Sequence, residues 1–585
     1  MPLTDLHDET TAAIIDRWEG QFAPFLAILH EIQGHYGYLP EASLHQVSQR
    51  LRIPLSELYG TVTFYHFFRL EAPGAAPDVW MCESSACCLK DLPSLERELA
   101  AARLPAKHSG HVHRIPCPGR CDQPVPVFVG DRVFAAAAPG RVDRLAPATS
   151  PLPPETGLEE CVLGGIRDGI ASLDEYRSSG GYASLARAAK EPAWVIGELK
   201  ESGLTGRGGA GFPTGVKWEA VRGEKNQPKY IVCNADEGEP GCFKDRCLMD
   251  HAPHRLIEGM ALASLITGAE QGVVYLRYEY PETLARLQGA IDEAEGAGLL
   301  GDNVAGTGRA FHLVIRRGAG AYICGEETSL LNSLEGRHPF PRDKPPYPTT
   351  HGLFGRPTVI NNVETFATIP PLLAMGGKRF AALGTGGNKG TRIFSVSGDI
   401  VRPGNYELPI GTPLSTLLEK HAGGAPGGRK IQGVTMAGIS GGFVGAADLD
   451  VPLDPKSLAA LGGMLGAGGI IVHDDTRCMV AAARASMHFL AHESCGKCFP
   501  CRIGTTRTTE ILDEMRAAAG GGKKVREDAL GEIADLEEVM GEASACGLGL
   551  AAPFVTRTLK KYWPDQIEAH LAGKCPKGVC ERKAR

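Results

Sequence analysis

Three cysteines lie within seven positions of the stretch ESCGKCFPCR, at Cys495, Cys498 and Cys501. A C-x2-C-x2-C run wraps one face of a cubane iron–sulfur cluster and needs a single remote thiolate to complete the ligand set. Cys546, in ASACGLG, supplies the obvious fourth thiolate. Zinc sites usually pair two C-x2-C or Cys/His groups, so we predict a 4Fe-4S cluster here, with structural zinc and free thiols as the alternatives.

A second set of cysteines lies near the start of the chain, as Cys82-x4-Cys87 followed by Cys117-x3-Cys121. Four thiolates in two pairs are the number that a 2Fe-2S cluster needs. Cys88 stands beside Cys87 and leaves one ligand ambiguous, although the C-x4-C spacing favours Cys87. Buried reduced thiols and zinc are the alternatives at this second set.

The other cysteines carry less information. Six of them are isolated in the sequence and are predicted to be small core residues: Cys161, Cys233, Cys242, Cys247, Cys324 and Cys478. Cys575 and Cys580 lie in a Lys/Arg-rich tail with no second pair. The sequence therefore predicts no metal site in the tail, and the role of these two cysteines stays open.

A glycine-rich loop, Gly206-Arg207-Gly208-Gly209-Ala210-Gly211, matches G-x-G-x-x-G. Alone, this pattern is a weak sign of a Rossmann dinucleotide site. Its context differs, because AWVIGELKESGL before it reads as a helix, and the strand KYIVC after it leads into the polar loop NADEGE. Glycine amides with Arg207 or Lys217 could still cradle an anionic group, in a fold other than the Rossmann fold.

The elements around these groups suggest several domains in the 585-residue chain. Apolar residues at helical spacing predict helices within 22–70, including the stripe Phe25, Ile28, Leu29 and Ile32. A small α/β unit with a helix at 93–101 and a hairpin turn at Gly130-Asp131 follows, and after it an Ala/Pro-rich stretch. We predict these divisions: a helical unit 1–72, a 2Fe-2S domain 73–145, a linker 146–175, a large α/β domain 176–388 that carries the glycine loop, a strand-rich domain 389–470, a helical cluster domain 471–572 and a basic tail 573–585.

The bulk composition restricts the class of partner. A net charge of -7 is mild for this length, which argues against nucleic-acid or anionic-membrane binding. No stretch reaches the roughly 20 apolar residues that a membrane helix needs, and the acidic start MPLTDLHDET is unlike a secretory or transit peptide. We expect a cytoplasmic protein without direct membrane contact, in which the cysteines are thiols and metal ligands.

Six longer motifs carry a family resemblance: GLTGRGGAGFPTGVKW, CNADEGEPGCFKDR, GAGAYICGEETSLLNSLEG, KPPYP, NNVETF and ESCGKCFPCRIGT. Together they resemble the FMN- and NADH-binding 51 kDa subunit of respiratory complex I over roughly residues 195–555. The first 145 residues resemble its 24 kDa thioredoxin-like 2Fe-2S partner subunit, here fused in one chain. Such a fusion is similar to the diaphorase (beta) subunits of NAD-dependent formate dehydrogenases and NAD-reducing hydrogenases.

The resemblance implies a multidomain α+β and α/β fold. It comprises a helical unit with a thioredoxin-like 2Fe-2S domain, an FMN-binding α/β domain that is not a true Rossmann fold, a ubiquitin-like SLBB domain and a helical 4Fe-4S bundle. It also implies the site residues. FMN would be held by Gly206, Arg207, Gly208, Gly209, Lys217, Asn234, Asp236, Glu237, Gly325, Glu326, Asn361, Asn362 and Thr365, with Glu237, Glu326 and Lys217 as catalytic residues. NADH would be held by Phe212, Glu239, Tyr322, Glu327, Lys344 and Tyr347.

Two positions depart from the family pattern. Ala220 stands where relatives often carry an aromatic residue, and Tyr347 replaces a common Phe. The carboxylate of Glu239 could accept from a ribose hydroxyl and repel a 2'-phosphate, so we predict preference for NAD over NADP.

The implied activity is hydride exchange between NAD(H) and FMN, with single electrons relayed through the clusters to or from a catalytic subunit. The segments DEYRSSGGYASL and PHRLIEGM look most like formate dehydrogenase subunits. An iron–sulfur-rich partner containing Mo or W is therefore predicted, with a hydrogenase or a complex I-type module as the alternative. A non-catalytic assembly or redox-sensing scaffold is the hypothesis from a different class.

Overall fold

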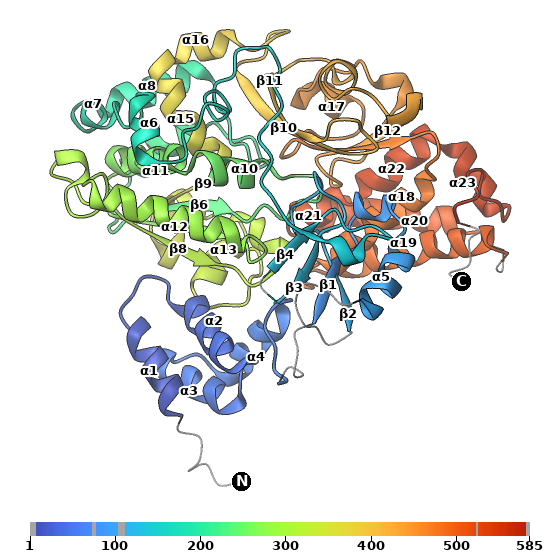
Figure 1. Ribbon diagram of the computed structural model, residues 1–585, viewed down its shortest axis with the longest axis horizontal. Helices are drawn as coiled ribbons and strands as arrows, with labels where there is room; N and C mark the ends of the chain where they lie inside the picture. The colour runs from blue at the N-terminus through green and yellow to red at the C-terminus, as the bar shows by residue number, and fades with distance from the viewer. Residues whose placement is uncertain (1–7, 73–77, 103–110, 131, 522–523, 581–585) are drawn as a thin grey trace.

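The computed structural model describes residues 8–72, 78–102, 111–130, 132–521 and 524–580. The expected acidic start falls mostly outside these residues, as does Asp131 of the expected hairpin turn. Figure 1 shows the N-terminal helices at one end of the molecule, the parallel sheet and its helices above them, and the C-terminal helices to one side.

Four helices form the N-terminal unit: α1 (Glu9–Trp18), α2 (Phe25–Tyr36), α3 (Glu41–Leu51) and α4 (Leu55–Phe64). The predicted apolar stripe of α2 is buried along its whole length. Pro24 and Pro54 stand immediately before α2 and α4, where their fixed φ suits a helix start. The same core includes Tyr275 and Ile360, so these helices pack against the parallel sheet described below.

The second unit is a five-stranded sheet in the order β2-β1-β3-β4-β5. Its strands are β1 (Val79–Cys82), β2 (Val112–Ile115), β3 (Val127–Val129), β4 (Arg132–Ala135) and β5 (Ala146–Pro147), with helix α5 (Leu92–Ala101). Strands β1 and β2 are parallel, and the other pairs are antiparallel. The edge strand β5 comes from the Ala/Pro-rich stretch, where two residues are too short to show a strand pattern.

The central unit has a parallel sheet in the order β8-β7-β6-β9. Its strands are β6 (Tyr230–Ala235), β7 (Gln271–Leu276), β8 (His312–Arg317) and β9 (Thr358–Asn362). Strands β6, β7 and β9 are almost wholly buried, as strands covered on both faces must be, whereas three of the six residues of the edge strand β8 are partly exposed. The helices around them are α6 (Leu173–Ser178), α7 (Leu185–Lys190), α8 (Pro192–Ser202), α9 (Thr214–Gly223), α10 (Lys244–His251), α11 (Pro253–Thr267), α12 (Pro281–Gly296), α13 (Glu327–Leu334), α14 (Pro348–His351), α15 (Val363–Met375) and α16 (Gly377–Ala382).

A mixed sheet of order β11-β10-β14-β12-β13 follows. It contains β10 (Thr391–Gly398), β11 (Gly404–Pro409), β12 (Ile431–Met436), β13 (Phe443–Gly445) and β14 (Gly469–Asp474), with helix α17 (Pro455–Ala460). Only β10 and β14 pair in parallel. This unit has its own apolar core, which explains why it reads as a separate domain in the sequence.

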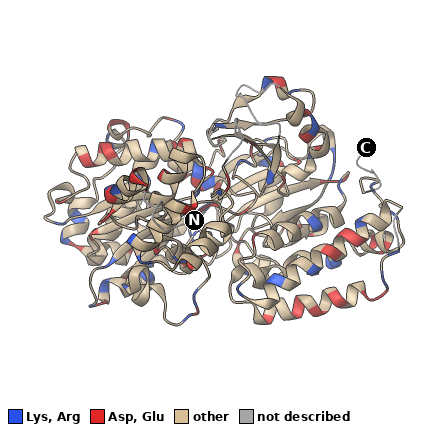
Figure 2. Ribbon diagram, turned by 90° about the horizontal axis from the view of Figure 1, so that it is seen from below, with Lys and Arg blue, Asp and Glu red and all other residues tan. Residues whose placement is uncertain are grey.

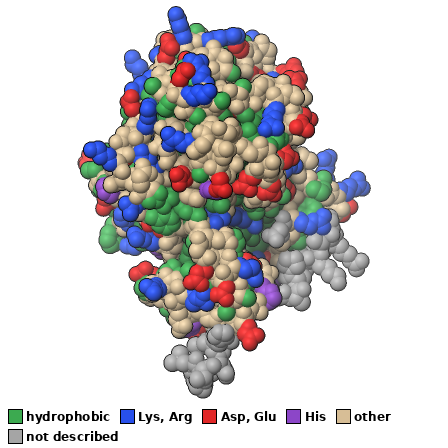
Figure 3. Space-filling view, turned by 90° about the vertical axis from the view of Figure 1, so that its left-hand side faces the viewer, with side chains coloured by type: hydrophobic (Ala, Val, Ile, Leu, Met, Phe, Trp, Pro, Cys, Tyr) green, Lys and Arg blue, Asp and Glu red, His purple; other side chains and the backbone are tan. Residues whose placement is uncertain are grey.

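The C-terminal unit is helical: α18 (Met479–His492), α19 (Phe499–Ala519), α20 (Ala529–Ala543), α21 (Gly547–Ala551), α22 (Pro553–Tyr562) and α23 (Pro564–Leu571). None of the helices that the structure describes is both long and apolar enough to cross a bilayer. Acidic and basic residues are interspersed along the helices (Figure 2). They are also intermixed on the face shown in Figure 3, where apolar side chains gather above the N-terminal helices.

Candidate flavin and iron–sulfur site

The central sheet has a topological switch point between β6 and β9. The chain runs outward from β6 through β7 to β8 and then returns to the other side of β6 as β9. Ligands of open α/β sheets bind outside the carboxyl ends of strands at such points. The strand register sets Asn234 beside Asn362, so the polar loop after β6 and the end of β9 meet there.

The glycine loop lies against this switch point. The amide of Arg207 donates to Oγ1 of Thr365 at 2.9 Å, at the start of α15. A Cβ on Gly208 would come within 3.3 Å of the Asn362 Cβ, so a side chain at this position would press on Asn362 and force it to shift. Gly206 donates to the carbonyl of Phe212 at 2.9 Å and closes the loop on itself.

A buried ion network underlies the loop. Arg207 is 2% exposed, and its Nε lies 4.0 Å from Oε1 of Glu364. Lys244 places Nζ 2.9 Å from Glu364 Oε2 and 2.8 Å from Asp245 Oδ1. Burial opposes ionisation of Glu364, but Lys244, Arg392 and Arg207 together lower its pKa. Burial lowers the pKa of Arg207 to about 10, and the Arg392 cation adds to this effect.

Sequence reasoning missed Lys244 and Glu364. Both lie inside quoted motifs, CFKDR and NNVETF, and that was the available signal. Neither charge is unusual in a sequence, and only the fold shows that both are buried.

Buried polar atoms line the edge of the switch point. Asn234 donates through Nδ2 to the carbonyl of Gly325 at 2.8 Å and accepts from the amide of Asp236 at 3.1 Å. Burial raises the pKa of Asp236 well above its usual range. Asp236 Oδ2 and Asn361 Oδ1 are buried and have no hydrogen-bond partner among the described residues. These orphaned atoms fit the polar edge of a flavin ring, because a buried polar group needs a partner.

Glu237 is turned toward α10. Its carboxylate accepts from the amides of Asp245 at 2.9 Å and Arg246 at 3.1 Å, and from the hydroxyl of Tyr280 at 2.9 Å. Burial, followed by the neighbouring Asp245, raises the pKa of Glu237 to about 7. The structure thus holds the predicted catalytic carboxyl in the wall of the site, with a pKa near neutrality.

Exposed rings and a small ion cluster flank the opening of the site. Phe212 and Tyr347 are 49% and 57% exposed, which is unusual for aromatic side chains. Lys217 lies 5.9 Å from the Phe212 ring centre and 4.0 Å from Glu327 Oε2. Lys344 bridges Glu326 at 3.1 Å and Glu327 at 2.7 Å. These are the residues predicted to bind the nicotinamide nucleotide, together with the catalytic candidates Glu326 and Lys217.

Glu239 and Tyr322 are joined through their side chains, since the Tyr322 hydroxyl donates to Glu239. Glu239 also accepts from the amides of Ile439 at 2.9 Å and Ser440 at 3.1 Å. Even so, burial raises its pKa. The Tyr322 amide donates to Glu493 at 3.0 Å, which connects this site to the loop that precedes Cys495.

The N-terminal cysteine set is compact. Cys82, Cys87, Cys117 and Cys121 are all buried, and the Sγ atoms of Cys117 and Cys121 are 3.3 Å apart. Backbone amides of Ser84 and Gly119 donate to Sγ of Cys82 and Cys117, both at 3.4 Å. Cys88 differs from these residues, because it is exposed and its thiol donates to the carbonyl of Glu83 at 2.9 Å. This geometry favours Cys87 as the ligand.

The same cysteine loop contacts the segment that follows β6. Gly241 donates its amide to Cys121 Sγ at 3.2 Å. Arg277 donates through Nη2 to the carbonyl of Cys117 at 2.7 Å and through Nη1 to that of Glu237. Arg246 pairs with Asp122 at 2.9 Å. The first cysteine set therefore lies directly against the polar loop after β6.

The second cysteine set is formed by three segments of the helical unit. Cys495 lies in the loop after α18, Cys498 and Cys501 at the start of α19, and Cys546 at the start of α21. A Cβ on Gly549 would meet the Cβ of Cys501 at 2.8 Å, so this glycine lets α21 approach α19. Burial raises the pKa of Cys501 to about 12 and that of Cys546 to about 11. Cys501 is buried and the other three cysteines are half-buried, so the four thiols of this set lie at or just below the surface of the helical unit. Four cysteines on three adjoining segments fit a cluster that iron would complete.

Cys478 is buried in the core of the helical unit, as expected from the sequence. It also lies beside Cys575, Cys580 and the imidazole of His570, a grouping that sequence reasoning did not predict. This arrangement could not be predicted from sequence spacing, because Cys478 and Cys580 are 102 positions apart.

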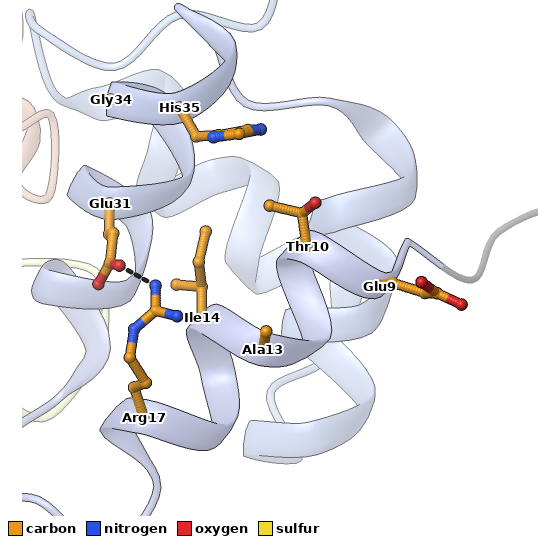
Figure 4. Close-up of a pocket in the computed structure, with 8 residues that line it drawn as sticks. All are labelled: Glu9, Thr10, Ala13, Ile14, Arg17, Glu31, Gly34 and His35. Carbon is orange, nitrogen blue, oxygen red and sulfur yellow. Dashed lines mark hydrogen bonds and ion pairs between the residues drawn. The ribbon is translucent and has the colours of Figure 1, made fainter.

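The structure has one small cavity beside the site and one open groove away from it. A small cavity lies where the units meet, with His66, Cys117, Asp236, Arg277, Tyr322 and Glu493 in its lining. An open groove on the N-terminal helices is lined by residues of α1 and α2 and carries the Arg17–Glu31 ion pair (Figure 4). None of the predicted flavin, nucleotide or cluster residues lines this groove.

Comparisons with known families cover most of the chain. The "Nuo51 FMN-binding domain" matches residues 199–371, and the "NADH-ubiquinone oxidoreductase-F iron-sulfur binding region" matches 481–570. The "Thioredoxin-like [2Fe-2S] ferredoxin" matches 11–149, and the "SLBB domain" matches 393–440. The predicted fold class is confirmed, as are FMN, a 2Fe-2S cluster and a 4Fe-4S cluster as the cofactors that these domains imply.

Individual proteins similar to this chain belong to the same families as the domain matches. The chain is 43% identical to the NADP-reducing hydrogenase subunit HndC of Solidesulfovibrio fructosivorans over 411 residues, which are 70% of this chain and 83% of the relative. It is 44% identical to an NADH-quinone oxidoreductase subunit of Rhizobium meliloti over 414 residues, which are 69% of this chain and 96% of the relative. A crystal structure of air-oxidised NAD+-reducing [NiFe]-hydrogenase contains a chain with TM-score 0.80 and 31% identity, and the match covers 94% of each chain. The chain therefore belongs to the family of flavin- and iron–sulfur-binding oxidoreductase subunits that includes the Nuo51-type subunit of NADH-quinone oxidoreductase, here joined to a thioredoxin-like ferredoxin domain in one polypeptide.

Proposed function

We propose that this chain is the diaphorase subunit of an NAD-linked complex, which exchanges hydride with NAD(H) and passes single electrons to or from a separate catalytic subunit. The observation that carries the proposal is the position of both cysteine sets around one loop. Cys121 accepts from Gly241 in the segment that follows β6. The segment before Cys495 is bonded through Glu493 to the amide of Tyr322, whose hydroxyl donates to Glu239 in that same segment. A bound flavin supplies the chemistry that converts a two-electron hydride into single electrons.

The chain's own residues would bind and orient the flavin nucleotide and the nicotinamide nucleotide. Arg207 and the amides of the glycine loop provide positive charge and donors for the phosphate of a flavin nucleotide. Phe212 and Tyr347 offer exposed ring faces for the nicotinamide nucleotide, and Lys344 and Lys217 supply cations nearby. Hydride transfer depends on positioning and electrostatics, so no side-chain nucleophile is required.

Glu239 supports a preference for NAD over NADP. Its carboxylate is fixed by Tyr322 and two backbone amides, so a 2'-phosphate beside it would meet a held negative charge. Glu239→Gln should raise the kcat/KM for NADPH relative to that for NADH. An unchanged ratio in a variant that still binds FMN would argue against this role.

The identity of the catalytic subunit with which this chain assembles is a separate part of the proposal. The relatives described above are hydrogenase and NADH-quinone oxidoreductase subunits, and they support the alternative partner better than a formate dehydrogenase. We therefore propose a hydrogenase-type or complex I-type assembly, while the formate dehydrogenase assignment and a cytoplasmic location stay predictions from sequence. Metal analysis of the co-purifying large subunit decides between them, because nickel, molybdenum and tungsten are distinguishable.

The direct test of the diaphorase activity uses the anaerobically purified full chain. NADH should bleach the flavin absorbance and drive steady reduction of a viologen or ferricyanide. A scaffold without redox function would give no turnover. A colourless, iron-free chain that is inert toward NADH would refute the proposal.

A further inference from the structure

Four potential metal ligands converge at the C-terminal end of the chain, outside the flavin and cluster residues described above. Cys478 stands immediately before α18, His570 lies in α23, and Cys575 and Cys580 follow α23. Their Sγ atoms and an imidazole nitrogen all lie within 4.8 Å of one another. Cys478, His570 and Cys575 are buried, and Cys580 is half-buried.

The separations match a tetrahedral ion. Sγ of Cys478 lies 3.4 Å from Nε2 of His570 and 3.7 Å from Sγ of Cys580. Zinc bonds of about 2.3 Å to sulfur and about 2.0 Å to nitrogen give tetrahedral edges of about 3.8 Å between sulfurs and about 3.5 Å between sulfur and nitrogen. A disulfide would need its sulfurs about 2.05 Å apart. A cubane cluster would need a wider set, normally of four thiolates.

Neighbouring groups orient these ligands. His570 Nδ1 lies 2.6 Å from the carbonyl of Gln566, which fixes a proton on Nδ1 and leaves Nε2 free to bind a metal. The amide of Ala481 donates to Cys478 Sγ at 3.4 Å, as amides do to metal-bound thiolates. Gln566 itself accepts from the amide of Met479 at 2.9 Å, so α23 is attached to the start of α18.

We propose that Cys478, His570, Cys575 and Cys580 form a structural Zn²⁺ site. Four protein ligands leave no open position, which is the mark of a structural rather than a catalytic zinc. The site joins the segment after α23, which has little apolar surface of its own, to the start of α18. At its other end, α18 leads into the loop of Cys495, so the zinc would fix the helix that carries one side of the 4Fe-4S site.

The test uses the full-length chain, purified anaerobically and dialysed against a chelator. Elemental analysis should give about one zinc per chain in addition to cluster iron, and zinc-edge X-ray absorption should give three sulfurs at about 2.3 Å and one nitrogen at about 2.0 Å. The double variant Cys575→Ser/Cys580→Ser should keep less than about a tenth of the zinc. Its iron and flavin per chain should stay unchanged. Cys161→Ser, which removes a buried thiol outside every sulfur cluster, should retain the zinc.

Two results would overturn the proposal: an iron-replete wild-type chain without zinc, or full zinc in the double variant. The absorption spectrum of the wild-type chain needs no variant, so the proposal stays testable if the double variant does not fold. Flavin and iron are measured on the same samples, so a failure here is distinct from a failure of the diaphorase proposal.

Discussion

Lys244→Met tests the buried ion network beneath the glycine loop. Lys244 is 1% exposed and is the cation within 3 Å of both Asp245 and Glu364. Removing one partner of a buried ion pair costs about 3–5 kcal/mol, because a charge is left uncompensated. Asp245 keeps its bond from Asn362, and Glu364 keeps the field of Arg207 and Arg392, so we expect the lower end, about 3 kcal/mol.

The assay is thermal unfolding followed by flavin release. For a domain of this size, about 3 kcal/mol corresponds to a fall of roughly 6–12 °C in Tm. The variant should also lose flavin on gel filtration, because Asn362 at the switch point loses its bond from Lys244. Lys200→Met is the matched control: its ion pair with Glu219 is half-exposed, and its loss should cost less than about 1 kcal/mol.

The stability deficit of Lys244→Met should also depend on pH, in a direction set by the pKa of Glu364. Burial opposes ionisation of Glu364, and Lys244 is the largest influence that lowers its pKa below 4.5. This carboxylate therefore stabilises the wild type above pH 4.5 and ceases to do so as the pH falls through the lowered value. The deficit of Lys244→Met should be largest near neutrality and shrink toward pH 4. A Tm within about 2 °C of wild type at pH 7.5, or Lys244→Met/Glu364→Gln less stable than the single variant, would refute the reasoning.

Three further outcomes are expected. Burial lowers the pKa of His66, but Glu493, 3.2 Å away, outweighs it and raises the pKa; the pair therefore stabilises below about pH 6.5 and this is lost at higher pH. The Tm deficit of His66→Gln should accordingly be larger at pH 6 than at pH 9, and equal deficits would contradict the pairing. Gly208→Val would push a side chain into Asn362, so flavin per chain should drop while both clusters remain; full flavin content would show that the close approach is unimportant. Cys546→Ser should lower iron by about four atoms per chain yet leave NADH bleaching of the flavin intact, and unchanged iron would remove Cys546 from the ligand set.

Sequence patterns were enough to predict a feature where the residues that determine it are close together in the chain. The C-x2-C-x2-C run predicts its own cluster type, and the apolar stripe of α2 predicts both the helix and its buried face. The two-residue strand β5 could not be predicted, because alternation needs a longer stretch to be visible.

Sites formed by residues far apart in the sequence could be recognised only from the three-dimensional structure. Lys244 and Glu364 are 120 positions apart and become partners only because α10 and α15 start at the same edge of the sheet. His570 lies 92 positions from Cys478, and neither belongs to a recognisable zinc spacing. The bond from Arg277 to the Cys117 carbonyl joins two domains, and no periodicity within either domain indicates it.

These contacts bear on how electrons leave the flavin. Electron transfer requires fixed separations between centres, and here the positions of both cysteine loops are set largely by backbone atoms. Arg277 binds the carbonyl of Cys117, and Gly241 approaches Cys121 through its amide. On the other side, Glu493 accepts from the Tyr322 amide, and Lys497 donates to the Pro341 carbonyl at 2.7 Å. Because buried backbone polar groups are costly to leave unpaired, the first loop is held against the segment after β6, and the second against the segments that contain Tyr322 and Pro341. The same contacts that stabilise the domain interfaces therefore also fix the geometry on which the proposed relay depends.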